Sequence, residues 1–522
     1  MSPRVPFARV LQFAALGGLC FLLLQSDART AEVAPAPHAP PAEVDRVVIA
    51  EIKARSEIMK NLQHLSDVIG PRLTGSAGLE KANKWTAEKM KAYGLENVRL
   101  EPWEIPVGWE RGKANMKLLE PGSGRVLTVA SRAWAPGTKG KVTGDVVVIK
   151  ANNKTDLQAY KGKLKNAVVI VSPPATVRPV QDLPATGPAK KDPPKDEPKK
   201  VEPKTNPPEE VSVGSWLNEE RQPRVGFTTE IIAFAREEGA ACVLSDSAKP
   251  HGLVVTGGSW GRGDRVTAQE GMAQLFLTHE HYALLYRLAT TEKTPPRVEV
   301  EVENKFVPGP VVVYNTVGEV RGTEKPDEIV VVGAHLDSWD LASGTTDNGT
   351  GSCIVLETAR VVAALAKQGN GPKRTIRFCL FTGEEQGLVG SAKYVEKYKA
   401  DMPKHSVALV HDTGTGKVVG FGLQGRKYLM PLLEPQLTSL VPLDGWKGLD
   451  VGFLSGTDHQ SFERFGVPGF ACRQDMEGYR LTHHTQSDTF DKAKEPNLIQ
   501  GAQVMAVTAV RIANLPDLLP RK

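Results

Sequence analysis

From about Val311 onward, the chain alternates between apolar segments of strand length and segments with the apolar spacing of a helix. Residues 328–334 are almost uniformly apolar, which is typical of a strand buried on both faces of a parallel sheet. Residues 352–366 then carry an apolar stripe at helical spacing. Further strands and one more helix are expected at residues 375–382, 388–398, 406–410 and 467–472. This alternation predicts an α/β domain with a mostly parallel sheet.

The rest of the chain has a different character. Its length of 522 residues predicts two or three domains. Residues 45–93 have the apolar spacing of helices, and short β-type runs follow, such as residues 144–150, which predict a separate, mainly β domain. The tract at residues 173–208 holds eleven prolines among lysines and acids. Because such a composition cannot bury a core, we expect an exposed, disordered loop there.

The N-terminus has the features of an export signal. Arg4 and Arg9 precede an apolar run at residues 10–24, and small residues follow at Ser26 and Ala28. This pattern predicts a signal peptide at residues 1–28 and a secreted or periplasmic protein. The competing interpretation is an uncleaved anchor, but a run of about 15 residues is short for a membrane span. Residues 29–44, rich in Pro and Ala, are expected to be a flexible spacer.

Charge and cysteine content exclude other classes. The formal net charge of +5 is small for this length and gives no case for a nucleic-acid or membrane partner. Beyond the predicted signal peptide four cysteines remain, with no Cys-x-x-Cys pair. They do not make a disulfide framework or a cysteine zinc site, although one disulfide stays open.

Residues of metal-ligand type gather at the ends of the predicted strands and in the neighbouring loops. They are His335, Asp347, Glu384, Glu385, Asp412 and His484. In open α/β sheets the functional crevice lies beyond the carboxyl ends of the strands, so we expect these loops to meet. Two imidazoles and three carboxylates can hold two zinc ions if one carboxylate bridges, and a spare carboxylate can take a proton from water. Cobalt or manganese would accept the same ligands.

The order of these residues resembles that of the M28 peptidases, the co-catalytic zinc aminopeptidase group. The likeness rests on His335-x-Asp337, Asp347-Asn348-Gly349, Glu384-Glu385, Asp412 and His484, with support from residues 70–76, 457–459 and 484–489. It implies a twisted, mostly parallel mixed sheet flanked by helices, and a cis peptide between Asp347 and Asn348. It also implies two zinc ions: His335 and Asp412 would hold one, Glu385 and His484 the other, and Asp347 would bridge. Glu384 would be the general base.

Within this family the chain resembles the plasma glutamate carboxypeptidase branch, which carries an inserted protease-associated domain. The insert would span residues 119–298, with the disordered loop at 173–210, and the catalytic domain would comprise residues 45–118 and 299–522. The resemblance implies peptide substrates. It also implies a homodimer, which no other feature of the sequence indicates. We therefore expect an aminopeptidase, carboxypeptidase or dipeptidase.

Two other functions stay open. A glutaminyl cyclase-like acyl transferase would share the fold but use a single zinc ion, and a non-catalytic binding protein would use the inserted domain. The complete set of ligand-type residues favours the peptidase over both.

Neighbouring residues are expected to have supporting, structural or alternative roles. Asp337 is expected to orient the imidazole of His335, and Asp488 to brace the loop of His484. His411 is expected to face away from Asp412, because successive side chains alternate along a strand. His483 is the alternative to His484 as a ligand. His459 is expected either to line the site or to make a structural hydrogen bond.

Overall fold

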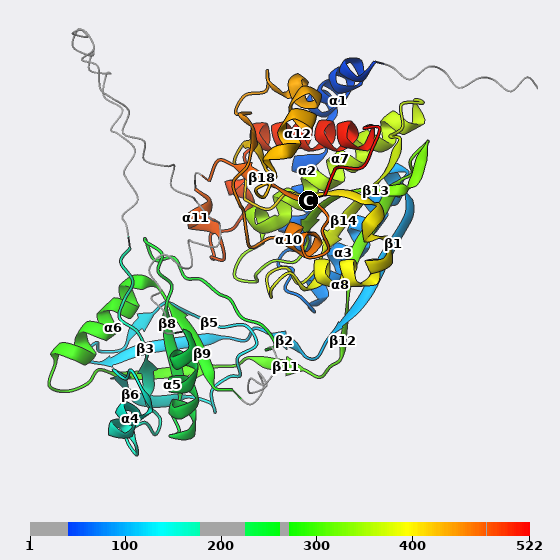
Figure 1. Cartoon of the computed structure of the whole chain (residues 1–522). Helices are drawn as coiled ribbons and strands as arrows, with labels where there is room; N and C mark the ends of the chain where they lie inside the picture. Colours follow the sequence, from blue (N-terminus) through cyan, green and yellow to red (C-terminus); the bar gives the residue numbers. More distant parts are fainter. Residues whose placement is uncertain (1–39, 178–224, 262–270, 477, 522) are drawn as a thin grey trace, which may run out of the picture. The chain divides into compact units, whose positions relative to one another are not determined.

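The computed structural model describes residues 40–177, 225–261, 271–476 and 478–521 (Figure 1). The predicted signal peptide and most of the Pro/Lys-rich tract lie outside these ranges. The spacer prediction is wrong at its end, because helix α1 (Pro41–Arg55) already begins at Pro41. Proline is favoured in the first turn of a helix, where its missing N–H has no intrahelical partner in any case.

An eight-stranded mixed sheet forms the larger part of the structure. In spatial order its strands are β1 (Glu96–Ile105), β12 (Val311–Val320), β14 (Arg374–Phe381), β13 (Lys325–His335), β15 (His405–Val410), β18 (Gly469–Gln474), β16 (Val418–Gly422) and β17 (Gly448–Asp450). The central strands β14, β13, β15 and β18 are parallel, whereas β1 and β12 add antiparallel pairs at one edge. This confirms the predicted fold class.

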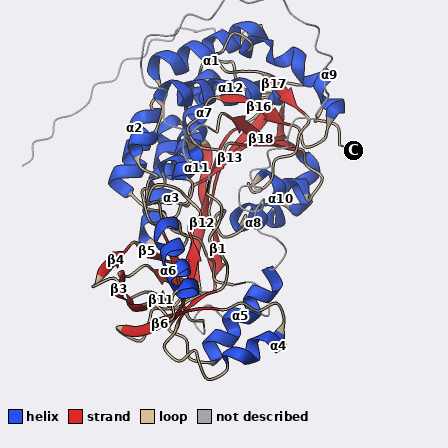
Figure 2. Ribbon diagram, turned by 90° about the vertical axis from the view of Figure 1, so that its left-hand side faces the viewer, coloured by secondary structure: helices blue, strands red, loops and turns tan. Residues whose placement is uncertain are grey.

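Helices cover both faces of this sheet, as Figure 2 shows. The alternation along β13 decides which side chain meets which layer, since successive strand residues point to opposite faces. Val330 and Val332 pack in one core cluster, and Ile329 and Val331 in another. The first cluster includes residues of α1, α2 (Ile58–Gln63), α3 (Ala77–Tyr93), α7 (Thr350–Lys367) and α12 (Glu495–Ala513). The second includes residues of α8 (Val389–Lys397) and α10 (His459–Glu463).

Helix α7 is unusually apolar. In the described part of the chain, one segment, Thr345–Lys367, is long and apolar enough to cross a membrane, and 83% of its most apolar window is buried inside the protein. It is therefore a core helix of the protein, packed against both the sheet and α12.

Residues between β1 and β12 form a second eight-stranded sheet. Its order is β4 (Arg125–Leu127), β3 (Ala114–Glu120), β10 (Arg297–Val302), β6 (Val142–Val148), β7 (Val168–Ile170), β8 (Cys242–Asp246), β9 (Ala273–Leu277) and β5 (Val129–Ser131). Helices α4 (Lys154–Leu157), α5 (Val225–Glu237) and α6 (His279–Thr291) accompany it, so this part holds more helix than expected. Strand β2 (Gly108–Glu110) precedes the second sheet in the chain, and β11 (Lys305–Val307) follows it. The two strands pair with each other as an antiparallel ribbon.

The pairing of β3 with β10 moves the edges of the insert outward from the sequence estimate. Residues 114–118 and 299–302 were assigned to the catalytic part, but they pair with each other inside the second sheet. The amino-acid composition does not change at the edges of the insert, because β3 and β10 continue the alternating pattern of the residues beside them. All four described cysteines are free and buried, so the described residues contain no disulfide.

His405, at the start of β15, links stability to pH. Its Nδ1–H donates to the carbonyl of Asp401 at 2.9 Å and its Nε2 accepts from the hydroxyl of Tyr394 at 3.1 Å. Burial lowers the pKa of this imidazole to about 4. The unfolded chain, with an ordinary His pKa of about 6.5, binds the proton first, so the stabilisation is complete above pH 6.5 and is lost as the pH falls toward 4.

We predict that His405→Gln reduces the loss of stability between pH 7.5 and 5 by about 2 kcal/mol, as judged from about 1.4 kcal/mol per pKa unit. Urea unfolding at the two pH values measures the change. His251→Gln, at an exposed position, is the control. An equal pH dependence in His405→Gln and wild type would contradict the assignment.

Candidate metal centre

Parallel strands deliver three groups of polar side chains to one edge of the larger sheet. His335 is the last residue of β13, Glu384 and Glu385 follow β14, and Asp412 follows β15. The register pairs His335 with Phe381 and Gly333 with Val410, so the three strands end at the same level. The side chains therefore meet beyond the carboxyl ends of the strands, as expected for this class of sheet.

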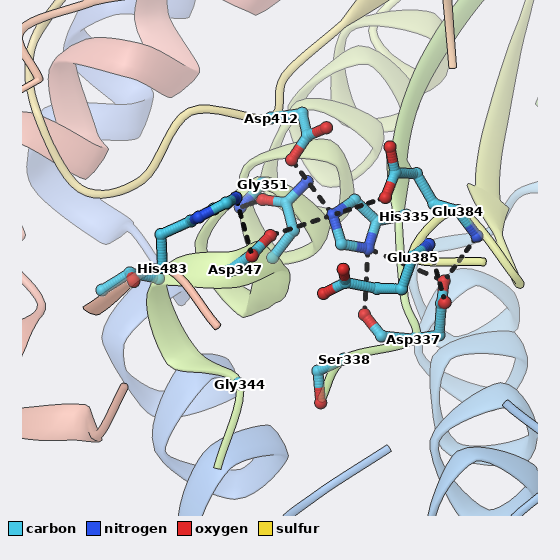
Figure 3. Close-up of polar contacts among 12 residues, drawn as sticks. His335, Asp337, Ser338, Gly344, Asp347, Gly351, Glu384, Glu385, Asp412 and His483 are labelled. Carbon is cyan, nitrogen blue, oxygen red and sulfur yellow. Dashed lines mark hydrogen bonds and ion pairs between the residues drawn. The ribbon is translucent and has the colours of Figure 1, made fainter. Parts of the chain in front are cut away.

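The first half of the cluster centres on His335 (Figure 3). Its Nε2 lies 3.0 Å from Asp412 Oδ1, 3.3 Å from Asp347 Oδ1 and 4.0 Å from Glu384 Oε2. The imidazole is buried, and its Nδ1 donates to the carbonyl oxygen of Asp337 at 2.9 Å. Nε2 is thereby left to face the carboxylates.

The second half centres on His484. Its Nε2 lies 3.0 Å from Glu385 Oε2 and 3.4 Å from Asp347 Oδ2. Asp347 thus presents one oxygen to each half. His483 is stacked on His484, with ring centroids 3.7 Å apart, and its Nε2 lies 3.9 Å from Asp347 Oδ2. Both histidines therefore reach Asp347, and the shorter contacts favour His484.

Asp337 contacts the imidazole of His335, as expected, and it also binds the loop of the two glutamates. Its backbone carbonyl accepts the hydrogen bond from His335 Nδ1 at 2.9 Å, and its carboxylate lies 3.6 Å from the same nitrogen. The carboxylate accepts from Thr74 Oγ1 at 3.0 Å and from the backbone N–H groups of Glu384 and Glu385 at 3.3 and 3.4 Å. Asp337 therefore holds the loop that carries both glutamates.

The loop of Asp347 is fixed from two sides. The peptide between Asp347 and Asn348 is cis, as the family resemblance implies. Asp488 accepts hydrogen bonds from the backbone N–H groups of Thr346 and Asp347 at 2.6 and 3.1 Å. It thus ties the Asp347 loop to the segment that contains His484.

Arg72 fixes the other side of that loop. Its guanidinium is fully buried and donates to the carbonyls of Leu336 and Gly344 at 2.7 Å each. It also donates to the carbonyls of Ser343 at 2.8 Å and Gly70 at 3.1 Å. One side chain from the N-terminal helical region therefore links the end of β13 to the loop of Asp347.

Burial and mutual repulsion dominate the electrostatics of the cluster. Burial, and then the neighbouring carboxylates, raises the pKa of Glu384 and Glu385 well above the ordinary value, and burial raises that of Asp412. Burial alone would also raise the pKa of Asp347, but the imidazole of His335 and the two adjacent histidines lower it. Burial alone would lower the pKa of His335, yet the charges of Asp412 and Glu384 raise it well above the ordinary value.

The donor set fits a divalent metal. In three combinations, each of three residues, nitrogen and oxygen atoms of His335, Asp347, Glu384, Glu385, Asp412, His483 and His484 lie within 4.8 Å of one another. Asp347 Oδ2 and Glu385 Oε1 are buried, and neither accepts a hydrogen bond from any described residue. Such oxygens lack the compensation that buried polar groups require, and a bound cation would supply it.

Two cavities flank the cluster. One is lined by Trp339, Gly344, Asp347, Glu385, His484 and Asp488. The other, beside Asp412, is lined by Leu454, Gly456, Thr457, Ala471 and Cys472. Trp339 was not singled out in the sequence, and its ring stands edge-on to His484 at 5.8 Å between centroids. No local pattern marks a tryptophan as site-lining, so only the fold reveals it.

Three residues near the cluster are buried but do not take the position of a metal ligand. His411 is buried, with neither ring nitrogen hydrogen-bonded to a described residue. His459 Nε2 lies 3.1 Å from the carbonyl of Leu454, which supports the structural alternative. Asp458, within the segment 457–459 that supports the family resemblance, is buried, and burial raises its pKa to about 7.

The sheet, with imidazoles and carboxylates gathered at the carboxyl ends of its parallel strands, has the form of a metallopeptidase. Comparisons with known proteins agree with this class. The model of peptidase family M28 matches residues 315–509, the region that contains every candidate ligand.

Similarity to individual proteins extends over most of the chain. Carboxypeptidase Q of Mus musculus is 28% identical over 478 residues, which cover 90% of this chain and 88% of that protein. The Homo sapiens protein of the same name is 27% identical with the same coverage. A peptidase M28 precursor from Shewanella amazonensis superposes with a TM-score of 0.70 at 24% identity, covering 92% of this chain and 98% of the other.

A zinc aminopeptidase from Bacillus subtilis superposes with a TM-score of 0.58 at 18% identity, covering 87% of this chain and 93% of the other. The match to the M28 model and the similarity to carboxypeptidase Q together indicate a metallopeptidase, and the imidazole and carboxylate donors of the cluster suit zinc.

We predict that Arg72→Met lowers the free energy of unfolding by about 3 kcal/mol or more, because several buried carbonyls lose their donor at about 1–3 kcal/mol each. Urea unfolding and zinc content measure the effect. Arg55→Met is the control, since Arg55 is exposed and pairs with Glu51 one helical turn away; such surface pairs contribute about 0–1 kcal/mol. Equal stability of the two variants would contradict the role of Arg72.

Proposed function

We propose that this protein is an exported, di-zinc exopeptidase that removes residues from peptide ends or cleaves dipeptides. The observation that carries the proposal is the placement of Asp347, with Oδ1 toward His335 and Oδ2 toward His484. A single carboxylate between two sets of ligand-type residues is the arrangement that a pair of metal ions needs. Export to the periplasm or outside the cell is supported by the signal-like residues 1–28 alone.

The residues divide into two sets around this bridge. His335 and Asp412 would hold one zinc ion, Glu385 and His484 would hold the other, and Asp347 would contact both. Bound zinc polarises a carbonyl and lowers the pKa of a water ligand to about 7. The buried oxygens of Asp347 and Glu385 that lack hydrogen bonds support this assignment.

Glu384 is the group that moves protons in this proposal. Its carboxylate is buried beside the cluster, and its nearest contact with His335, 4.0 Å, is longer than those of Asp347 and Asp412. Its pKa is raised by burial, which brings a carboxylate closer to the pKa range suited to a general base and acid. At its carboxylate oxygen Glu384 would accept a proton from the attacking water and then give it to the leaving amine.

Peptide substrates are supported by the relatives. The relatives include a carboxypeptidase and an aminopeptidase, so the proposal covers attack at either end of a peptide. We propose no nucleic-acid partner and no membrane partner after export. Homodimerisation is proposed from resemblance only, and light scattering at several concentrations tests it.

We predict that Glu384→Gln lowers kcat by about 100-fold to 10,000-fold, the contribution usual for general acid–base catalysis, while zinc content stays at the wild-type level. Peptide hydrolysis and mass spectrometry of bound metal give the two readouts. Glu396→Gln, exposed on α8, is the matched control with full activity. Substantial turnover by Glu384→Gln would remove Glu384 from the proposed role.

The end specificity is tested by product analysis of zinc-loaded enzyme with free dipeptides, N-blocked peptides and C-amidated peptides. Cleavage of unblocked dipeptides alone identifies a dipeptidase. Cleavage of C-amidated but not N-blocked peptides identifies an aminopeptidase, and the reverse identifies a carboxypeptidase. No cleavage, with one zinc ion per chain, would contradict the proposal in favour of a cyclase-type enzyme.

A further inference from the structure

A segment of the inserted region contacts the loop that carries His484. We call residues 249–256 the clamp segment and residues 480–488 the ligand loop. The backbone N–H of Thr256 donates to the carbonyl of His484 at 3.0 Å, and Val255 forms an isolated antiparallel bridge with Thr485. The two segments are more than 200 residues apart in the chain, so this contact exists only in the folded protein.

Side chains extend the same contact at both ends. Gln486 accepts from the backbone N–H of Val254 at 2.9 Å and donates to the carbonyl of Gly252 at 3.2 Å. At the other end, the Lys249 ammonium donates to the carbonyl of Arg480. The clamp segment therefore follows the ligand loop from Arg480 to Gln486.

The catalytic part holds the ligand loop at Thr482 and at Asp488. Thr482 receives a hydrogen bond from Thr346 Oγ1 at 2.8 Å, and Asp488 accepts from the Thr346 N–H at 2.6 Å. Between these points His484 has a φ of +60°. A residue other than glycine adopts this left-handed conformation uncommonly, and it persists where the surroundings hold it. The hydrogen bond from Thr256 acts on the backbone of that residue.

The clamp segment is itself fixed. Arg111 donates to Thr256 Oγ1 at 3.0 Å and makes a bidentate ion pair with Asp340 at 2.7 and 2.9 Å. Asp340 lies in the loop between Asp337 and Asp347. The N–H of Gly252 donates to Glu280 Oε1 at 3.1 Å, which anchors the segment to α6. Thr256 is thus held from both the inserted and the catalytic parts.

We propose that the clamp segment positions His484 for metal binding, so that the inserted region completes the half of the metal site formed by Glu385 and His484. This inference rests on the proposed function, because it assigns the placement of one ligand of that site. Thr256 and Gln486 are positioning residues that touch neither metal nor substrate. Thr256 donates its N–H to the backbone of the ligand loop, and the side chain of Gln486 ties that loop to the backbone of the clamp segment. Among the described residues, no hydrogen bond joins the clamp segment to His335 or Asp412, so we expect the effect to fall on the half formed by Glu385 and His484.

The test is a cobalt(II) titration of the metal-depleted full-length chain, followed by visible absorption. Gln486→Ala and Thr256→Val should each weaken binding of one of the two cobalt ions by about tenfold, the lower end of the range for groups that support a ligand. Binding of the other ion should be unchanged. In steady-state assays of the zinc enzyme, kcat should fall more than KM changes.

Two variants serve as controls. Thr256→Ser keeps the hydroxyl that accepts from Arg111 and should bind both ions as wild type does. Gln368→Ala removes an exposed glutamine at the end of α7, away from the clamp segment. Wild-type affinity for both ions in Gln486→Ala and Thr256→Val would overturn the inference. A wild-type chain that binds two ions but cleaves no peptide would contradict the proposed function and leave the inference standing, because affinity is measured without substrate.

Discussion

Repulsion among buried carboxylates is the constraint on which the rest of the site depends. The side chains of Asp347, Glu384, Glu385 and Asp412 are at most 9% exposed and share one small region at the end of the sheet. Buried charges are costly unless they are paired. His335 is the imidazole that contacts most of these carboxylates, and a single imidazolium cannot neutralise four of them. A pair of divalent cations can neutralise them. Bound metal would therefore stabilise the folded site as well as supply its chemistry.

Fixed groups around the cluster keep these carboxylates in place. Arg72 binds the backbone at both ends of the loop between His335 and Asp347, and Asp337 binds the backbone of Glu384 and Glu385. Asp488 joins the Asp347 loop to the ligand loop. All three act on main-chain atoms, so the side chains of the candidate ligands keep their oxygens and nitrogens for other partners. The contact of the clamp segment with the ligand loop extends this arrangement to the inserted region.

The sequence predicted what depends on local pattern. The apolar runs at 375–382 and 406–410 place strands β14 and β15 within one residue of their bounds, and the polar residues after them converge because parallel strands share an edge. Contacts between residues far apart in the chain could not be predicted from the sequence. Arg72 bonds to Leu336 and Gly344, more than 260 residues away, and no spacing rule indicates this. The edges of the insert were misplaced because the pairing of β3 with β10 is also long-range. Asp337 was assigned to the right neighbour, but the sequence could not show that its backbone carbonyl accepts the hydrogen bond.

The central claim is that two metal ions share Asp347. A crystal of the zinc-loaded protein, with anomalous diffraction collected on both sides of the zinc absorption edge, tests it most directly. The account predicts two anomalous peaks on either side of the Asp347 carboxylate, one beside His335 and Asp412 and the other beside Glu385 and His484. Proteins with paired hydrolytic metals hold them about 3.5–4 Å apart. A single peak at full zinc loading, or two peaks that do not both contact Asp347, would contradict the account.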